Sequence, residues 1–224
     1  MRHAIYVTPA RDHPLTRAAA DWLGRDAFTP GSIQQPVNDT TAEPARYGFH
    51  GTLVAPFRLA TGYSNSDLAA SLDGYCATQQ AFVLPLRIGR LGPFFALVPA
   101  ADATAIRALA DAAVAHFSPL RAPLSDEDYL RRKPERLTEA QRDYLLRWGY
   151  PYVFSEFRFH MTLTGPVDEH AAAGMEALLN DVFSSLLTEP LTVESLSIFT
   201  ETTSGQPFHI THTAPFAAAA TART

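Results

Sequence analysis

Two copies of one short pattern, 110 residues apart, constrain the fold of this chain more than any other feature of its sequence. Residues 49–56 read FHGTLVAP and residues 159–166 read FHMTLTGP, so Phe, His, Thr, Leu and Pro recur at the same offsets. Self-similarity at a fixed offset indicates a fold built from related units. At 224 residues, the chain is long enough for two such units around one shared core.

The expected secondary structure repeats together with this pattern. Capping residues and apolar positions at helical spacing predict helices that start near residues 14, 66, 102 and 138 and another around 175–186. Alternating strand formers predict strands at 4–8, 47–57, 82–88, 94–98, 152–164, 191–199 and 207–213. Residues 29–46 contain prolines and a glycine and are expected to form a loop.

The order of these elements predicts an α/β (α+β) fold with two pseudo-symmetric lobes. Helix, strand, helix, strand, strand runs from about residue 14 to 99 and again from about 138 to 216. Residues 1–10 are expected to pair into the sheets. We therefore expect a single bilobed domain over residues 1–224, with a mixed or antiparallel sheet, outer helices and a central groove.

The His-x-Thr spacing places chemistry on one face of each predicted strand. Residues i and i+2 of a strand face the same side, so His50 and Thr52 share a face, as do His160 and Thr162. If the lobes are related by a pseudo-twofold axis, the two pairs face each other across the groove. A lone histidine on a strand is more often structural, but two in matched contexts favour function.

Two imidazoles and two hydroxyl groups suit attack on a phosphodiester. One neutral histidine can accept the proton of the attacking water, while the other donates a proton to the leaving oxygen. The threonines can hold the non-bridging oxygens. Neither motif supplies the three ligands of a hydrolytic zinc site, so no metal and no other cofactor is expected.

Four further residues are candidates for substrate binding. Arg46 and Arg158 share the face of the following histidine by strand parity, and arginine suits phosphate. Lys133 lies in a basic segment, residues 131–136, whose neighbouring carboxylates favour a solvated loop over a lid. Tyr6 can stack on a base or sugar, although packing in the core is the safer interpretation.

A third copy, FHITHTAP at residues 208–215, falls outside the repeat. Shifted back by 110 residues, His209 meets Pro99 instead of a histidine. We therefore expect an edge or outer strand here, and a catalytic or binding role for His209 stays open.

Composition narrows the range of partners. The formal net charge of −5 argues against long nucleic acid, although a local basic cluster can still bind a small phosphate. The single cysteine, Cys76, excludes an internal disulfide, and MRHAIYVTPA lacks the apolar core of a signal peptide. We expect a cytoplasmic monomer that binds a small phosphorylated metabolite and no membrane.

The paired tetrapeptides resemble those of the two-histidine phosphoesterase superfamily. The strings YVTP, RYGFHGTLVAPF and WGYPYVFSEFRFHMTLTGPV resemble its bacterial branch associated with phosphonate-utilisation genes. This resemblance implies a bilobed fold and metal-free chemistry on small, often cyclic, phosphodiesters. It assigns catalytic roles to His50, Thr52, His160 and Thr162. Val54 departs from the basic residue expected after the first tetrapeptide.

The expected function is hydrolysis of a small cyclic phosphodiester, such as a ribosyl or nucleotide cyclic phosphate, in phosphonate utilisation. Three alternatives stay open: an RNA-end 2′,3′-cyclic phosphodiesterase or ligase, a non-catalytic binder of a phosphorylated metabolite, and a metal hydrolase using His50, His160 and His209. The sequence does not say which histidine is the acid.

Overall fold

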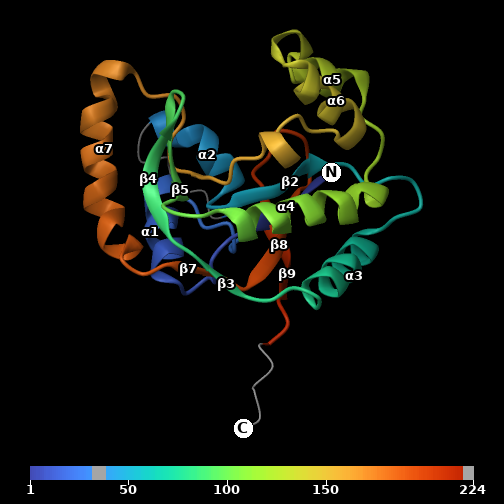
Figure 1. Cartoon of the computed structure of the whole chain (residues 1–224), viewed down its shortest axis with the longest axis horizontal. Coiled ribbons are helices and arrows are strands. Elements are labelled where there is room, and N and C mark those ends of the chain that lie inside the picture. The colour runs from blue at the N-terminus through green and yellow to red at the C-terminus, as the bar shows by residue number, and fades with distance from the viewer. Residues whose placement is uncertain (32–38, 219–224) are drawn as a thin grey trace.

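The computed structural model describes residues 1–31 and 39–218 as a mixed α+β fold around one antiparallel sheet (Figure 1). Seven strands form this sheet in the order β4 (Leu86–Leu91), β5 (Phe94–Pro99), β6 (Met161–Thr162), β2 (Gly51–Phe57), β1 (Arg2–Val7), β8 (Ser195–Glu201) and β9 (His209–Pro215). Every neighbouring pair is antiparallel. The predicted fold class is confirmed.

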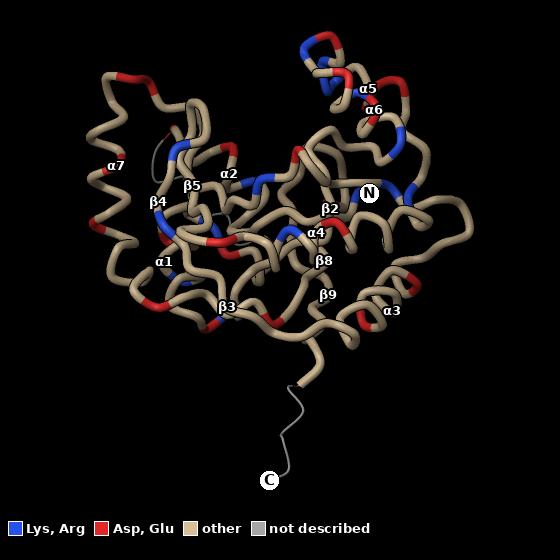
Figure 2. Tube along the Cα trace, in the orientation of Figure 1, with Lys and Arg blue, Asp and Glu red and all other residues tan. Residues whose placement is uncertain are grey.

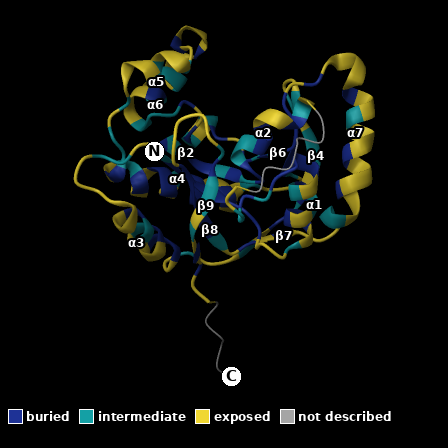
Figure 3. Cartoon of the chain, turned by 180° about the vertical axis from the view of Figure 1, so that it is seen from behind, coloured by how far each residue is buried: buried dark blue, intermediate teal, exposed yellow. Residues whose placement is uncertain are grey.

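Four helices cover one face of this sheet and leave the other face for the cleft described below. They are α1 (Pro14–Leu23), α3 (Asn65–Cys76), α4 (Thr104–Phe117) and α7 (Glu169–Phe183). Their apolar faces join the buried side chains of the sheet in one hydrophobic core. Figure 3 shows the same arrangement, with buried strands inside and exposed outer surfaces on α3 and α7.

Three further helices lie outside this layer. Helix α2 (Ala42–Tyr47) precedes β2, and helices α5 (Asp126–Arg131) and α6 (Glu139–Trp148) form an arm that rises to one side of the sheet (Figure 1). Among the described residues, no helix is long and apolar enough to cross a membrane.

The repeat in the structure has different limits from the predicted one. Its unit is strand, helix, strand, helix, strand, strand, from β1 to β4 and again from β5 to β8. The small second sheet pairs β3 (Phe82–Leu84) with β7 (Leu191–Val193), which are equivalent members of the two units. Strand β9 lies at the sheet edge beyond the repeat, as predicted for the third copy of the motif.

The two units exchange their last strands. Strand β4 of the first unit pairs with β5 of the second, and β8 of the second pairs with β1 of the first. Each side of the sheet therefore combines strands from both units, so the expected lobes at 14–99 and 138–216 do not correspond to separate halves. The central pair β2–β6 lies on the pseudo-twofold axis.

Local sequence explains where several helices begin and end. Capping boxes formed by Ser64 with Asp67 and by Thr138 with Gln141 start α3 and α6, so the predicted helix start near residue 138 is confirmed, and the cap of α3 lies two residues before Ser66. Gly149 ends α6 in the left-handed conformation, with φ 68°.

Two predictions of local structure were wrong. Residues 39–47 form a 3₁₀ turn and helix α2 instead of a loop, and residues 32–38 of that predicted loop lie outside the described residues. The strand expected at 152–164 contracts to Met161–Thr162. Phe154 has a φ of 53° within a 3₁₀ turn, which is incompatible with a continuous strand.

Candidate active site

The antiparallel pairing of β2 with β6 brings the two repeated tetrapeptides side by side. Gly51 lies directly opposite Met161. One step to either side, this register sets His50 against Thr162 and Thr52 against His160. Residues that are 110 positions apart in the chain thus form one local cluster with approximate twofold symmetry.

All four residues of this cluster line one open cleft. The cleft encloses about 1220 Å³, including space open to solvent, which suits a small metabolite. Its walls come from β1, β2, α2, the arm and the segment after β8. The residues that line it are Arg2, Tyr6, Glu43, Arg46, Tyr47, His50, Thr52, Ala55, Pro56, Arg131, Arg132, Tyr150, His160, Thr162, Ser204 and Gly205.

The two tetrapeptides differ below the cleft. Gly51 of the first tetrapeptide lies against the aromatic ring of Phe159, whereas Met161 stands at the equivalent position of the second. A Cβ atom on Gly51 would lie 2.4 Å from Cε2 of Phe159, so only glycine leaves room for this ring. Phe49 and Phe159 are both buried in the core. The phenylalanine before each histidine therefore anchors its tetrapeptide in the core.

Each imidazole is held by the main chain two residues before it. Nδ1 of His50 lies 2.9 Å from the carbonyl oxygen of Gly48, and Nδ1 of His160 lies 2.8 Å from that of Arg158. A carbonyl oxygen only accepts hydrogen bonds, so Nδ1 must carry the proton in both rings. Nε2 of each neutral ring is then an unprotonated base, and on protonation it becomes the donor.

Burial lowers the pKa of both histidines. The pKa of His50 falls to about 4, because burial disfavours its charged form and the charges of His160 and Arg25 add to this effect. Burial also lowers the pKa of His160, against the hydrogen bond to Arg158. Both rings are therefore neutral near pH 7 in the empty cleft, and a bound anion would raise both pKa values.

The rings differ in their aromatic support. Tyr6 stacks on His50 with ring centroids 3.9 Å apart and an interplanar angle of 21°. Tyr6 lies opposite Thr52 in the sheet, and the equivalent position opposite Thr162 is Ala96. His160 has only a tilted ring contact with Phe94, at 5.8 Å. Tyr6 is 1% exposed and one face of its ring is covered by His50, so it positions His50.

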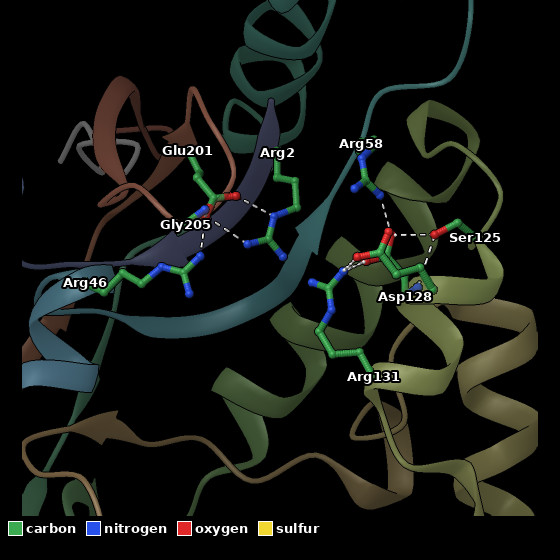
Figure 4. A network of polar contacts seen from close by, with 9 residues as sticks. Arg2, Arg46, Arg58, Ser125, Asp128, Arg131, Glu201 and Gly205 are labelled. Carbon is green, nitrogen blue, oxygen red and sulfur yellow. Dashed lines mark hydrogen bonds and ion pairs between the residues drawn. The ribbon is translucent and has the colours of Figure 1, made fainter.

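Arg46 lies in the cleft wall, but a carboxylate restrains it. Glu201, which is 1% exposed, accepts hydrogen bonds from Arg46, from Arg2 and from the backbone N–H of Gly205 (Figure 4). These donors lower the pKa of Glu201 to about 2, against the effect of burial. Nε of Arg46 is buried without a hydrogen-bond partner among the described residues. Contact between Arg46 and substrate stays a prediction.

Two other candidates are not among the residues that line the cleft. Arg158 has an exposed side chain, and the role the structure gives it is its carbonyl bond to His160. Lys133 is exposed and has a left-handed backbone, with φ 50°. Its neighbours Arg131 and Arg132 line the cleft instead. Substrate contacts by Arg158 and Lys133 stay predictions.

Tyr150 is a residue of the cleft that the sequence did not single out. It lines the cleft, and the guanidinium of Arg132 lies 4.8 Å from its ring centroid. The arginine-rich composition of residues 131–136 could have predicted that this segment lines part of the cleft. The acidic residues of the same segment concealed which of its basic residues line the cleft.

The third motif copy does not join the two histidines. His209 lies on edge strand β9 opposite Thr200 and is not among the cleft residues. Within the part of the chain that the structure describes, no group of three or more His, Cys, Asp or Glu side chains is arranged to hold a metal ion. The geometry therefore gives no support to a metal site formed by His50, His160 and His209.

A second cavity extends the cleft beyond His50 and has an apolar character. It shares Tyr47, His50 and Thr162 with the cleft and adds Pro44 and Phe94, among others. The histidine pair thus lies between an apolar end and an end lined by arginines. A ligand that reaches both ends must present a different chemistry to each.

Comparison with known proteins places the chain in a family. Residues 52–209, more than two thirds of the chain, match the family described as "Protein of unknown function (DUF1045)". The chain belongs to this family. The matched region contains His160, Thr162 and Thr52, and it ends at His209.

Two curated relatives share about a third of their aligned residues with the chain. The one from Janthinobacterium sp. (strain Marseille) is 36% identical over 222 residues, covering 92% of this chain and 49% of the relative. The one from Laribacter hongkongensis (strain HLHK9) is 34% identical over 216 residues, covering 94% and 50%. Both are named ribose 1,5-bisphosphate phosphokinase PhnN. The chain spans about half the length of these relatives.

A solved structure described as a phosphoesterase aligns over 97% of this chain and 98% of its own, with a TM-score of 0.44 and 10% identity.

Proposed function

We propose that this protein is a metal-independent phosphoesterase of the two-histidine kind that opens a small cyclic phosphodiester. One observation carries this proposal: two half-buried imidazoles, each held at Nδ1 by a carbonyl, share one cleft with two threonine hydroxyls. Both Nε2 atoms are thereby kept for proton transfer. The paired arrangement matches a reaction that needs one base and one acid.

In the proposed reaction, His50 is the base and His160 is the acid. His50 is stacked on Tyr6 and has the pKa of about 4, so it stays neutral when the anionic substrate binds. The charge of the phosphodiester raises the pKa of His160, which becomes protonated at Nε2. Binding of the anion thus creates the mixed protonation state that the empty cleft lacks.

The proton transfers balance within one turnover. Nε2 of His50 removes a proton from water as its oxygen bonds to phosphorus, and Nε2 of His160 donates a proton to the leaving oxygen as the P–O bond breaks. The threonine hydroxyls of Thr52 and Thr162 donate hydrogen bonds to the non-bridging oxygens. Exchange of protons with solvent restores both histidines after the monoester leaves.

The kinase named in the relatives requires a different site. The single lysine of this chain, Lys133, follows Arg132, so the phosphate-binding pattern G-x-x-x-x-G-K-[ST] is absent from the sequence. The chain aligns with only half of each relative. We infer that the region shared with these relatives carries a separate phosphoester activity. The names of the relatives support a substrate that is a ribose phosphate from phosphonate utilisation.

A screen of ribosyl and nucleotide cyclic phosphates in the presence of chelator tests this function. Wild type is expected to produce monoesters, and the double variant His50→Ala with His160→Ala is expected to produce none. Binding without turnover, unaffected by the substitutions, would identify a non-catalytic binder. Turnover only of oligonucleotide ends, with strong salt sensitivity, would identify an RNA-end enzyme. Loss of activity in chelator would contradict the metal-free mechanism.

A further inference from the structure

A pocket rich in arginine continues the catalytic cleft at its end remote from the apolar cavity. The two share Arg2, Pro56, Arg131 and Arg132 in their walls. Beyond these, the pocket adds Arg58 and Arg121, and Asp128 is the one carboxylate among the residues that line it. Five guanidinium groups therefore meet one acidic side chain in a protein whose formal net charge is −5.

The local carboxylates occupy three of these arginines. Glu201 binds Arg2, at 2.6 Å from Nε, and Asp128 binds Arg58 and Arg131 (Figure 4). In Figure 4 the two carboxylates lie on opposite sides of the view, and the head groups of Arg2 and Arg131 extend into the space between them. These ion pairs hold the arginines in place at the junction of the pocket and the cleft.

Arg121 and Arg132 have no such partner. Neither forms an ion pair with a carboxylate of the described residues, and Nε of Arg121 is buried without a hydrogen bond. The pKa of Arg121 is lowered to about 10 by burial and by the charge of Arg132, so Arg121 stays charged at neutral pH. Two neighbouring guanidinium groups without an anion repel each other, and an unsatisfied buried donor is costly.

The absence of a side chain at Gly149 leaves space for the guanidinium of Arg121. A Cβ atom on Gly149 would lie 1.6 Å from NH2 of Arg121, so the glycine that ends α6 also provides the space for this guanidinium. Arg132 comes from the arm, directly after α5, and its guanidinium lies 4.8 Å from the ring centroid of Tyr150. The arm, which the first structural unit lacks, therefore contributes one wall of an anion site.

Two of the outer helices carry only acidic charges. Helices α3 and α7 carry acidic residues and no Lys or Arg. In Figure 2 no basic residue lies on α3 or α7; basic residues lie near the centre of the molecule, on the arm and on β4 beside α7, where Arg90 pairs with Glu169. A positively charged recess in an otherwise acidic protein favours a small multiply charged ligand over a long polyanion.

We propose that Arg121 and Arg132 bind a second phosphoryl group of the substrate, so that the substrate class is a cyclic phosphodiester of a sugar that carries another phosphate. This inference rests on the proposed function for the phosphodiester itself. The planar fork of arginine can donate two hydrogen bonds to phosphate oxygens, and the phosphate would provide the anion that the pair lacks.

The test compares ribose-based cyclic phosphates that differ only in an additional 5-phosphate. Wild type is expected to show at least a tenfold higher kcat/KM for the doubly phosphorylated member. Arg132→Gln is expected to reduce this ratio about tenfold, since a charged hydrogen bond contributes on the order of 1.5–3 kcal/mol. Arg136→Gln is the matched control, because Arg136 is exposed in the same segment, outside the pocket, and should keep the ratio. A wild-type ratio near one, or a ratio unchanged in Arg132→Gln, would overturn the inference.

Calorimetry with inorganic pyrophosphate separates this inference from the proposed function. Binding is expected in wild type and in His50→Ala, and at least tenfold weaker binding in Arg132→Gln. If no cyclic phosphate is hydrolysed but this pattern holds, the proposed function fails and the anion site stands. If pyrophosphate binds equally to wild type and Arg132→Gln, the anion site is wrong. If the pattern holds while the substrate ratio is near one, the site binds free phosphate and the substrate assignment is wrong.

Discussion

The two halves of the candidate active-site cleft have the same strand arrangement but differ in the residues that surround each histidine. On the first side, Tyr6 stacks on His50 and fills the position opposite Thr52. On the second side, Ala96 occupies the equivalent position opposite Thr162, and Phe94 touches His160 at a tilt. A duplicated strand pair has thus produced two imidazoles of similar orientation in unequal environments. That inequality is what a reaction with one base and one acid requires.

The largest expected effect comes from removing either imidazole. His50→Ala and His160→Ala should each lower kcat by at least about 100-fold on an alkyl phosphodiester, the scale of general acid–base loss. A p-nitrophenyl phosphodiester separates the roles, because its leaving oxygen needs no proton. On this substrate kcat should fall far less in His160→Ala than on the alkyl phosphodiester. In His50→Ala kcat should fall by the same factor on both substrates. Equal losses for both variants on both substrates would remove the distinction between acid and base.

The pH dependence of kcat/KM sharpens the same comparison. In the proposed mechanism the free enzyme is active with His50 neutral and His160 protonated. The rate should therefore fall below about pH 4, as His50 gains a proton, and above the pKa of His160, which lies under 6.5. On each limb kcat/KM should change by nearly tenfold per pH unit. Because both pKa values lie under 6.5, the optimum is expected below pH 6.5. A profile that stays flat from pH 5 to 9 would contradict paired histidines.

The sequence predicted the histidine pair because two equivalent strands near a twofold axis become neighbours. Once the repeated motif at His50 and His160 is recognised, the two-residue period of a strand places each histidine and its threonine on the same face. The exchange of β4 and β8 was not predictable in this way, since β1 and β5 share no sequence echo that marks them as equivalent. The contribution of the arm to the cleft was missed for another reason. Its charges balance locally, and only the tertiary structure distinguishes Arg132, which lines the cleft, from Lys133, which does not.

A third test concerns the unequal packing beneath the two histidines. Gly51→Ala should destabilise the fold by about 1–3 kcal/mol, because the new methyl group overlaps the ring of Phe159. Chemical denaturation measures this change. The double variant Gly51→Ala with Phe159→Leu should show less than the sum of the two single losses, since the smaller side chain relieves the overlap. If the losses in free energy of unfolding were additive, the absence of a side chain at Gly51 would not be what accommodates the Phe159 ring.

The smallest expected effect tests the role of Tyr6 in setting the pKa of His50. Tyr6→Leu removes the stacked ring and admits water, so the pKa of His50 should rise from about 4 towards 6.5. The acid limb of kcat/KM should move to higher pH, with only a several-fold loss at the optimum. Tyr6→Phe keeps the ring and should leave that limb in place, so a shift in Tyr6→Leu would not be due to a general loss of stability.

Phe94→Leu is the matched change beside the other histidine, and it should affect only the basic limb of kcat/KM, which is assigned to His160. If Tyr6→Leu and Phe94→Leu moved the same limb, the two histidines would titrate as one coupled pair, and the assignment of base and acid by environment would be lost.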